Sequence, residues 1–571
     1  MEDKKTYTAI NIGPIISTLQ MARKPRELWA ASYLFSHLME CIIDTLFEFK
    51  ITKADIISPD ILDKSKKENQ NLGVGLYPDR IFLKNSLQEP LNEQSFIEKV
   101  FVEFISSTKF IVEKNDGNVE KKLKREFFKM MIVSLDISIK QGENEESKAI
   151  QELNQALDKL ELFNIANKDA EAETVRDLIR LKYGSPLFVE AFGKREFPVE
   201  SLGEIAAKQL EVLEPEKWEK FAKGIKSDDK NEAEKAYSHF SEKNLKSYHK
   251  YICIVQADGD NVGTTVSHKE LQDGKVKEIS TALLDFGKEA TKKIEKYGGL
   301  PIYAGGDDLL FIAPVVGIEK KEDGSWKNIL DLLEELNNDS FKGVIDKVAK
   351  CKLTKEDKSK KTSNIDDTST SEDCDQNNDK EDKLIEASLS FGISITYYKY
   401  PLYEALESAR KLLFDVAKKI EDKKAWAWSL RKHSGSSFDV AFSRKDEELM
   451  KAFLALIEAT TDDDLVSAVA HKLYEKDELS NMVLDSGSKT RLNALFDNIL
   501  EFKDNPYFNA VKDLMPVLYK VDKVDKADKT DKTDKTDKTD KTDKTDKTDK
   551  TDKTDNYVTK LYSLLRTAKF I

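Results

Sequence analysis

Apolar and polar residues alternate along the chain in patterns that predict both strands and amphipathic helices. The segment 7–12, Tyr-Thr-Ala-Ile-Asn-Ile, predicts a short strand near the N-terminus. From Pro25 to Phe49, apolar residues recur at spacings of three and four, which predicts a long helix with proline in its first turn. The stretch from about 115 to 245 is mostly charged and favours helices, and helical patterns return after about residue 436.

A second group of strands and helices begins at Tyr251. The continuous run over 251–256 predicts a central strand that is buried on both faces. A helix with one apolar face is expected over 276–297, and two short runs within 300–313 predict a hairpin around a Gly-Gly-Asp-Asp turn. A strand at 389–395 and a helix over 402–420 follow. The order strand, helix, hairpin, strand, helix is that of a ferredoxin-like palm.

Two segments are low in sequence complexity. Residues 354–382 are rich in Lys, Ser, Thr, Asp and Asn, so we expect a disordered loop there. Residues 520–555 repeat Lys-Val-Asp, Lys-Ala-Asp and then Lys-Thr-Asp. Thr and Asp are poor helix formers and the repeat has no apolar stripe, so we expect a solvated linker; an extended charged helix is the alternative. A further amphipathic helix is expected at 557–567.

The composition narrows the class of protein. The 571 residues suggest about three or four domains, and 105 acidic against 92 basic residues give a net charge of −13. This balance argues against an autonomous nucleic-acid-binding protein, although not against RNA contact inside a larger assembly. The four cysteines form no CxxC pair, which argues against a zinc ribbon or a disulfide framework. Without a signal-peptide core or a long apolar run, we expect a cytoplasmic protein.

The predicted palm brings three carboxylates together. In a palm, the end of the first strand lies beside the hairpin tip, so Asp258 is expected next to Asp307 and Asp308. Carboxylates this close repel one another unless a cation binds them, and oxygen ligands without Cys or His favour Mg²⁺ or Mn²⁺. Two such ions can hold a triphosphate and activate an attacking hydroxyl. Gly305 and Gly306 would leave room for the nucleotide.

Other interpretations of these residues stay open. A Gly-Gly-Asp-Asp turn alone is also a good hairpin sequence, and it is Asp258 at the end of a buried strand that favours a metal site. Asp260 is either a further ligand or a helix-capping residue before Val262.

Two motifs resemble a known family. Ala-Asp-Gly-Asp-Asn-Val-Gly at 257–263 and Tyr-Ala-Gly-Gly-Asp-Asp at 303–308 are similar to the large subunit of type III CRISPR effector complexes, the palm polymerase/cyclase protein. The segments 11–34 and 197–206 resemble its III-B, or Cmr, branch. The resemblance covers nearly the whole chain apart from the two low-complexity inserts.

The resemblance implies an α+β fold with two ferredoxin-like, palm-type domains that face each other, and two mainly α-helical domains. The segment 75–80 stands at the hairpin position of the first palm without a carboxylate pair, so this palm would bind or cover a nucleotide without catalytic metals. Ser32 and Trp29 in its long helix are either nucleotide contacts or packing residues. The expected domains are a degenerate palm at 1–115, a helical domain at 116–245, a catalytic palm at 246–435 and a helical bundle at 436–571.

The family grips the triphosphate with basic residues of the second palm. By resemblance, the nucleotide-binding candidates there are Ser390, Lys418, Lys432 and Ser434, with Lys419 beside them. Lysine suits phosphate as a point charge. A solvated helix face is the alternative for the two neighbouring lysines.

The resemblance also implies the activity and its partners. We expect a target-RNA-activated nucleotidyltransferase that uses ATP and two Mg²⁺ (or Mn²⁺) ions, bound to other Cmr-type subunits, guide RNA and target RNA. The product would be a cyclic oligoadenylate, or AMP joined to a small acceptor such as S-adenosylmethionine. No histidine is followed by aspartate, so we expect no histidine-aspartate nuclease. A non-catalytic RNA-binding scaffold and a diguanylate-cyclase-like enzyme are the alternatives.

Overall fold

The computed structural model describes most of the chain. The described residues are 4–84, 93–108, 127–140, 143–163, 176, 179–180, 185–194, 197–227, 230–267, 271, 274–343, 345, 387–420, 423–443, 446–460, 463–499, 505–533 and 557–571. Two compact units result from the contacts between residues. Unit 1 comprises 1–201, 257–311 and 330–389, and unit 2 comprises 202–256, 312–329 and 390–571. The predicted disordered loop at 354–382 lies outside the described residues.

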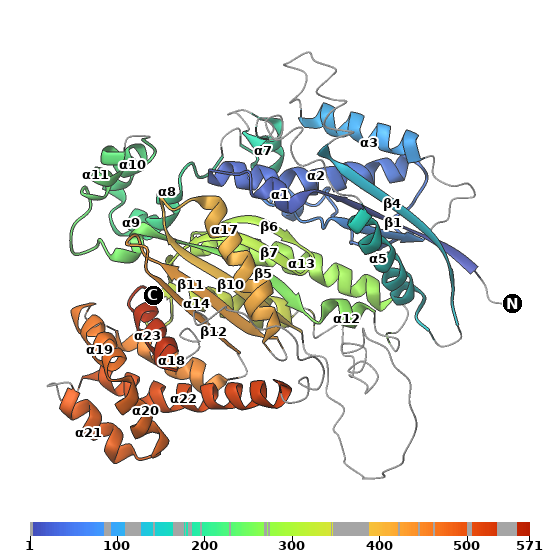
Figure 1. Cartoon of the computed structure of the whole chain (residues 1–571). Helices are drawn as coiled ribbons and strands as arrows, with labels where there is room; N and C mark the ends of the chain where they lie inside the picture. Colours follow the sequence, from blue (N-terminus) through green and yellow to red (C-terminus); the bar gives the residue numbers. More distant parts are fainter. Residues whose placement is uncertain are drawn as a thin grey trace, which may run out of the picture. The chain divides into compact units, whose positions relative to one another are not determined.

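The first palm is a four-stranded sheet with helices packed against it. Its strand order is β2-β3-β1-β4, which is the ferredoxin-like order. The elements are β1 (Lys4–Gly13), α2 (Pro25–Glu48), β2 (Ile56–Ser58), β3 (Arg80–Lys84), α3 (Glu93–Thr108) and β4 (Lys129–Ser138). Figure 1 shows β1 and β4 side by side, in agreement with their antiparallel pairing from Lys4↔Ser138 to Gly13↔Lys129.

Helix α2 forms where the sequence predicts it, and for the expected reasons. Pro25 occupies the first helical turn, where its missing N–H is no loss. Leu28, Leu38 and Ile42 on its apolar face are completely buried. This helix therefore forms the core of the first palm, and the residues on its other turns are fixed in place by that packing.

The second palm has the same strand order within a larger sheet. Its six strands run β12-β11-β10-β5-β7-β6, and the last four repeat the order of the first palm. The elements are β5 (Tyr251–Asp260), α12 (Val262–Val266), α13 (Lys275–Tyr297), β6 (Leu300–Gly305), β7 (Asp308–Pro314), β10 (Ser388–Tyr397), α17 (Leu402–Lys411), β11 (Ala425–Arg431) and β12 (Ser437–Ser443). The predicted α+β class with two ferredoxin-like palms is confirmed.

Two predicted domain boundaries are wrong. The first palm does not end at 115, because β4 supplies one of its four strands. The strand contains the apolar run Met-Met-Ile-Val at 130–133, but this run is short and lies within a stretch that is otherwise mostly charged. The second palm does not end at 435, because β12 pairs with β11 as far as Ser443.

Helices make up much of the remaining described chain. Between the palms lie α5 (Glu145–Phe163), α7 (Pro186–Phe192), α8 (Leu202–Ala206), α9 (Lys208–Leu213), α10 (Pro215–Ile225) and α11 (Lys230–Tyr237). After the second palm come α18 (Glu447–Ala459), α19 (Asp463–Glu475), α20 (Asp477–Asp485), α21 (Lys489–Ile499), α22 (Pro506–Thr533) and α23 (Tyr557–Ala568). Every helix in the described residues is too short or too polar to serve as a membrane-spanning segment.

The expected linker at 520–555 is wrong for its first part. Helix α22 continues into the repeat as far as Thr533, while 534–556 lies outside the described residues. Asp522 is buried, and its carboxylate lies 2.9 Å from Lys560 Nζ on α23. The apolar first half of α22 nucleates the helix, so the charged repeat only has to extend it, which is far less costly than forming a new helix.

Glu214 shows how a single buried carboxylate holds part of unit 2 together. It lies at the start of α10, and its Oε1 accepts hydrogen bonds from the Ser241 amide (3.0 Å), the Ser241 hydroxyl (2.6 Å) and Asn244 Nδ2 (3.0 Å). Lys217 donates to its other oxygen. Together with Ser241, Lys217 lowers the pKa of Glu214 to about 2.

We expect Glu214→Gln to lower the free energy of unfolding at pH 7 by about 1–2 kcal/mol, because charge-assisted hydrogen bonds are weakened. The folded-state pKa is depressed, so this contribution is present above the unfolded-state pKa of roughly 4.5 and is lost as the pH falls toward about 2. Urea unfolding of both proteins at several pH values measures the difference. The control is Glu216→Gln on the exposed side of the same turn; an equal loss there would contradict the assignment.

Candidate functional site

The candidate site lies where β5 ends and β6 turns into β7. Asp258 is the third residue from the end of β5, and Asp307 and Asp308 lie at the turn. Asp258 and Asp307 are half-buried and Asp308 is exposed, so the three can reach solvent. Gly306 has a φ of 68°, in the left-handed region that glycine adopts most easily, and it allows the tight turn.

Backbone contact holds the two segments together. A Cβ atom placed on Gly259 would lie only 2.6 Å from Asp307 Cβ and 2.7 Å from Asp307 Oδ2. The main chain next to Asp258 therefore touches Asp307, as the palm topology predicts. In the described residues, the oxygens of Asp258, Asp307 and Asp308 do not all lie within 4.8 Å of one another.

The spacing of these carboxylate oxygens fits an open Mg²⁺ site better than a closed metal cage. A closed metal cage needs three or more ligand atoms close together. Mg²⁺ instead is commonly bound through one or two carboxylates, with waters and substrate phosphates completing its octahedron. The open arrangement of Asp258, Asp307 and Asp308 is of the kind that binds Mg²⁺ in this way.

Asp260 has a structural partner. It is completely buried, and its Oδ2 accepts a hydrogen bond of 2.7 Å from Ser388 Oγ at the start of β10. The residue at the N-cap position of α12 is Asn261, with a φ of 64°, so Asp260 does not cap that helix. Asp260 joins the end of β5 to the beginning of β10, behind the exposed carboxylates.

The first palm contributes its own loop to the site. Gly75 and Tyr303 form a parallel bridge, and the Ala304 amide donates a 3.0 Å hydrogen bond to the Gly75 carbonyl. Burial raises the pKa of the Tyr303 hydroxyl well above its ordinary value, and the nearby charges of Asp308, Asp79 and Asp307 raise it further. Asp79 of the first palm therefore lies near enough to Tyr303 for its charge to act on the hydroxyl, as the charges of the two turn aspartates do.

Asp79 was missed by the sequence analysis, which noted only that no carboxylate pair stood at 75–80. Nothing in the local pattern distinguishes it from a turn residue. Burial raises the pKa of its carboxyl, against the charge of Arg80. Only the contact between the two palms shows that it belongs to this region.

Helix α13 links the palms a second time. Lys277 Nζ donates to the Ile56 carbonyl at 3.0 Å, and Thr281 Oγ1 donates to Asp60 Oδ2 at 2.9 Å. A Cβ on Gly287 would lie 2.5 Å from the Ala304 carbonyl oxygen, so this helix lies directly against β6. The loop at β2 and the hairpin strand β6 are thus held by the same helix.

The two predicted glycines have different surroundings. Gly306 has no atom within 4 Å of a Cβ position, so the space beside the turn is open, as expected for nucleotide access. A Cβ on Gly305 would meet the Tyr303 hydroxyl at 2.3 Å. The missing side chain of Gly305 makes room for the Tyr303 ring rather than for a ligand.

Ser390 does not fit its predicted role. It is completely buried, and its Oγ lies 3.4 Å from the Ala425 amide, which donates to it. The structure therefore gives it a packing role between β10 and β11. Lys418 lies in a short helical turn, Ala417–Lys419, whose Ala417 packs against Ala425 at the start of β11. Lys418 is half-buried and stays a candidate.

Lys432 and Ser434 lie at the wrong end of the sheet for the predicted nucleotide contact. They belong to the turn between β11 and β12, where the His433 amide lies 3.5 Å from the Tyr251 hydroxyl at the beginning of β5. Asp258 lies seven residues further along that strand, about 23 Å at 3.3 Å per residue. Lys432 Nζ instead lies over the rings of Phe438 (5.6 Å) and Phe570 (5.2 Å).

The two candidate contacts on α2 are buried. Trp29 is completely buried and donates a 2.8 Å hydrogen bond from Nε1 to the Gly73 carbonyl. Ser32 is only 4% exposed. The structure favours the packing interpretation for Trp29, and it leaves the Ser32 hydroxyl little surface for a ligand.

Comparison with protein families assigns both palms. Residues 7–131 match the family described as "CRISPR-associated protein Cmr2, N-terminal". Residues 251–362 match the family described as "Cas10/Cmr2, second palm domain". Both palms are thus similar to domains of Cas10/Cmr2 proteins.

A curated relative and a solved structure agree with this assignment. The CRISPR system Cmr subunit Cmr2 of Pyrococcus furiosus is 28% identical over 213 residues, which is 33% of this chain and 19% of that protein. The matched part is thus about a fifth of the relative. A chain of the type III-B Cmr-beta complex in its apo state covers 88% of this chain and 77% of its own length, with 12% identity and a TM-score of 0.53. That likeness shows a shared fold.

Proposed function

We propose that this protein is the nucleotidyltransferase subunit of a type III-B CRISPR complex. It would use ATP to make a signalling nucleotide when the complex, with its other Cmr-type subunits and guide RNA, binds target RNA. The observation that carries the proposal is the contact between Gly259 and Asp307, which sets the end of β5 against an exposed aspartate turn with open space beside it.

The residues of the turn fit the task of holding a polyphosphate through Mg²⁺. Asp258, Asp307 and Asp308 would bind the ions, which supply positive charge to the phosphates and lower the pKa of the attacking hydroxyl. Gly306 leaves open space where a triphosphate can approach the backbone. Lys418 and the neighbouring Lys419 are the remaining basic candidates of those that the sequence singled out; Lys419 Nζ lies 3.5 Å from Asp415 Oδ1.

The reaction would be an in-line displacement. The acceptor hydroxyl oxygen forms a bond to the α-phosphorus of ATP, the bond to pyrophosphate breaks, and the hydroxyl proton leaves to solvent or a nearby base. Catalysis of this kind depends on positioning and charge neutralisation more than on covalent chemistry. Asp260 and Tyr303 contribute indirectly, because the first fixes β10 to β5 and the second supports the turn beneath Gly305.

The two palms together provide places for two small molecules. The pairing of Gly75 with Tyr303 sets the first palm beside the hairpin that carries the aspartates. An acceptor held at the first palm would therefore lie near an ATP held at the second. The acceptor would be either a second ATP or a small molecule such as S-adenosylmethionine.

The test is synthesis by the purified complex with radiolabelled ATP and Mg²⁺, with and without target RNA. We expect a labelled product larger than ATP that forms only when target RNA is present. Parallel reactions with labelled GTP and with S-adenosylmethionine identify the base and the acceptor. A complex that binds target RNA but yields no product would support a scaffold, and a GTP-derived product without RNA would support a diguanylate-cyclase-like enzyme.

A further inference from the structure

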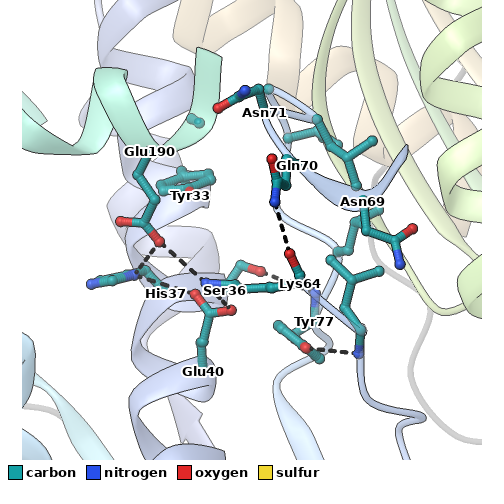
Figure 2. A pocket seen from close by; sticks show the side chains of 16 residues that line it. Tyr33, Ser36, His37, Glu40, Lys64, Asn69, Gln70, Asn71, Tyr77 and Glu190 are labelled. Atoms are coloured by element: carbon teal, nitrogen blue, oxygen red, sulfur yellow. Dashed lines mark hydrogen bonds and ion pairs between the residues drawn. The ribbon is translucent and has the colours of Figure 1, made fainter. Parts of the chain in front are cut away.

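A second polar site lies in the first palm, away from the aspartate turn. A cavity of about 300 Å³ opens between α2, the loop that leads to β3, and α7. Figure 2 shows His37, Glu40 and Glu190 turned toward one another on one side of this cavity, with Lys64 beside them. The nucleotidyltransferase mechanism uses none of these four residues, and all of them belong to unit 1.

The three side chains present donor atoms at short range. His37 Nδ1 lies 3.6 Å from Glu40 Oε2 and 3.5 Å from Glu190 Oε1. One donor atom from each residue lies within 4.8 Å of the other two. Ligands bound tetrahedrally at about 2.0–2.1 Å from a metal are about 3.3 Å apart, so only small movements are needed to reach that geometry.

The ring nitrogen of His37 that faces the two carboxylates is Nδ1. Ser107 Oγ donates its proton to the Phe104 carbonyl at 3.0 Å, so it must accept the 2.7 Å hydrogen bond from His37 Nε2. Its other ring nitrogen, Nδ1, faces the two carboxylates and can carry either a proton or a metal ion. The His37 side chain is 6% exposed, and its Nδ1 has no hydrogen-bond partner.

A proton or a metal ion on Nδ1 places positive charge between this nitrogen and the two carboxylates, and a metal ion would take the place of that proton. Metal-binding histidines characteristically donate a hydrogen bond from their other ring nitrogen, as His37 does to Ser107. Lys64 neutralises part of the charge, since its Nζ lies 2.6 Å from Glu40 Oε1 and 3.5 Å from Glu190 Oε1. It occupies the outer oxygen of Glu40 and leaves Oε2 facing His37.

We propose that His37, Glu40 and Glu190 bind a Zn²⁺ ion in the first palm. One imidazole nitrogen and two carboxylate oxygens suit Zn²⁺, with water from the cavity as the fourth ligand, whereas Mg²⁺ and Ca²⁺ prefer oxygen alone. His37 and Glu40 lie on α2 and Glu190 lies on α7, so the ion joins the two helices. Its role is structural, with Lys64 as an outer partner of Glu40.

The test uses the full chain carrying Asp307→Ala and Asp308→Ala, so that the turn aspartates bind no metal. After chelator treatment and dialysis, we expect one equivalent of Zn²⁺ to bind by calorimetry and to raise the melting temperature. Co²⁺ in its place should give the intense visible bands of a tetrahedral site. An octahedral Co²⁺ spectrum, or no binding, would overturn the proposal whether or not the chain makes nucleotides.

Variants identify the ligands. The Glu190 side chain is 34% exposed, so the Glu190→Gln variant should fold. We expect this variant to lose the bound Zn²⁺ ion and the visible bands of Co²⁺. The His37→Ala variant should lose the same Zn²⁺ ion and Co²⁺ bands. The matched control is His471→Ala, at an exposed histidine of α19, which should keep the Zn²⁺ ion and the Co²⁺ bands. Lys64→Met should bind Zn²⁺ more tightly, because a competing positive charge is removed. Unchanged stoichiometry in Glu190→Gln, or weaker binding in Lys64→Met, would mean that the cluster is only an ion-pair network.

Discussion

Asp307→Ala combined with Asp308→Ala is expected to abolish nucleotide synthesis by the target-bound complex, with a loss of more than about a hundredfold. Removing groups that stabilise transition-state charge typically costs that much or more, and here the ions themselves would lose their ligands. Both aspartates lie at a turn and Asp308 is exposed, so the fold does not depend on them. Assembly, target RNA binding and melting temperature are expected to stay unchanged.

The measurement is the initial rate of product formation from labelled ATP at saturating target RNA. The control is a double substitution of two exposed acidic residues on α13, Glu278→Ala and Asp285→Ala, which removes the same charge at another place. We expect the control complex to retain nearly the full rate. Substantial synthesis by the Asp307 and Asp308 variant would remove the metal assignment and leave the scaffold interpretation.

Gly259→Ala is expected to reduce synthesis by about a hundredfold although it changes no ligand. Its new Cβ would meet Asp307 Cβ at 2.6 Å and Oδ2 at 2.7 Å, so Asp307 has to move. Misplacement of a catalytic group by about 1 Å commonly costs this much in rate. Gly263→Ala, four residues along the same motif, has no atom within 4 Å of the new Cβ and lies in α12.

The pair of variants separates a local effect from general damage. Gly263→Ala should keep the full rate, and it should stabilise slightly because alanine favours a helix. Both proteins are compared by initial rate and by thermal melting. If Gly259→Ala keeps its rate, then Asp307 does not need the position seen here; if both variants lose activity equally, the whole motif rather than the contact is sensitive.

Local pattern was sufficient for the elements that carry the site. The apolar run at 251–256, the amphipathic helix and the glycine turn each specify their structure through neighbouring residues, and all three are found as expected. The order of these elements then leaves few topologies for a sheet, and the ferredoxin-like order confirmed here is the one it predicts. Because that topology sets the end of β5 beside the turn, the neighbourhood of Asp258 and Asp307 was also predictable.

The errors arose where a residue's role depends on partners far away in the sequence. Lys432 and Ser434 matched a motif, yet the register of β11 carries their turn to the beginning of β5. Ser390 is buried because neighbouring elements cover both faces of β10. Helix α22 runs into the repeat because a helix already nucleated by packing is easily extended.

The sequence by itself determined the second palm, the long helix α2 and the aspartate turn, since each depends on residues close together in the chain. The first palm was expected only from the family resemblance. Only the tertiary structure decided which side chains from distant parts of the chain come close to one another. It added β4 to the first sheet, brought Asp79 to Tyr303, and turned His37 toward Glu190, which is 153 residues away. Such encounters depend on the summed packing of whole elements, so no local pattern of apolar and polar residues can specify them.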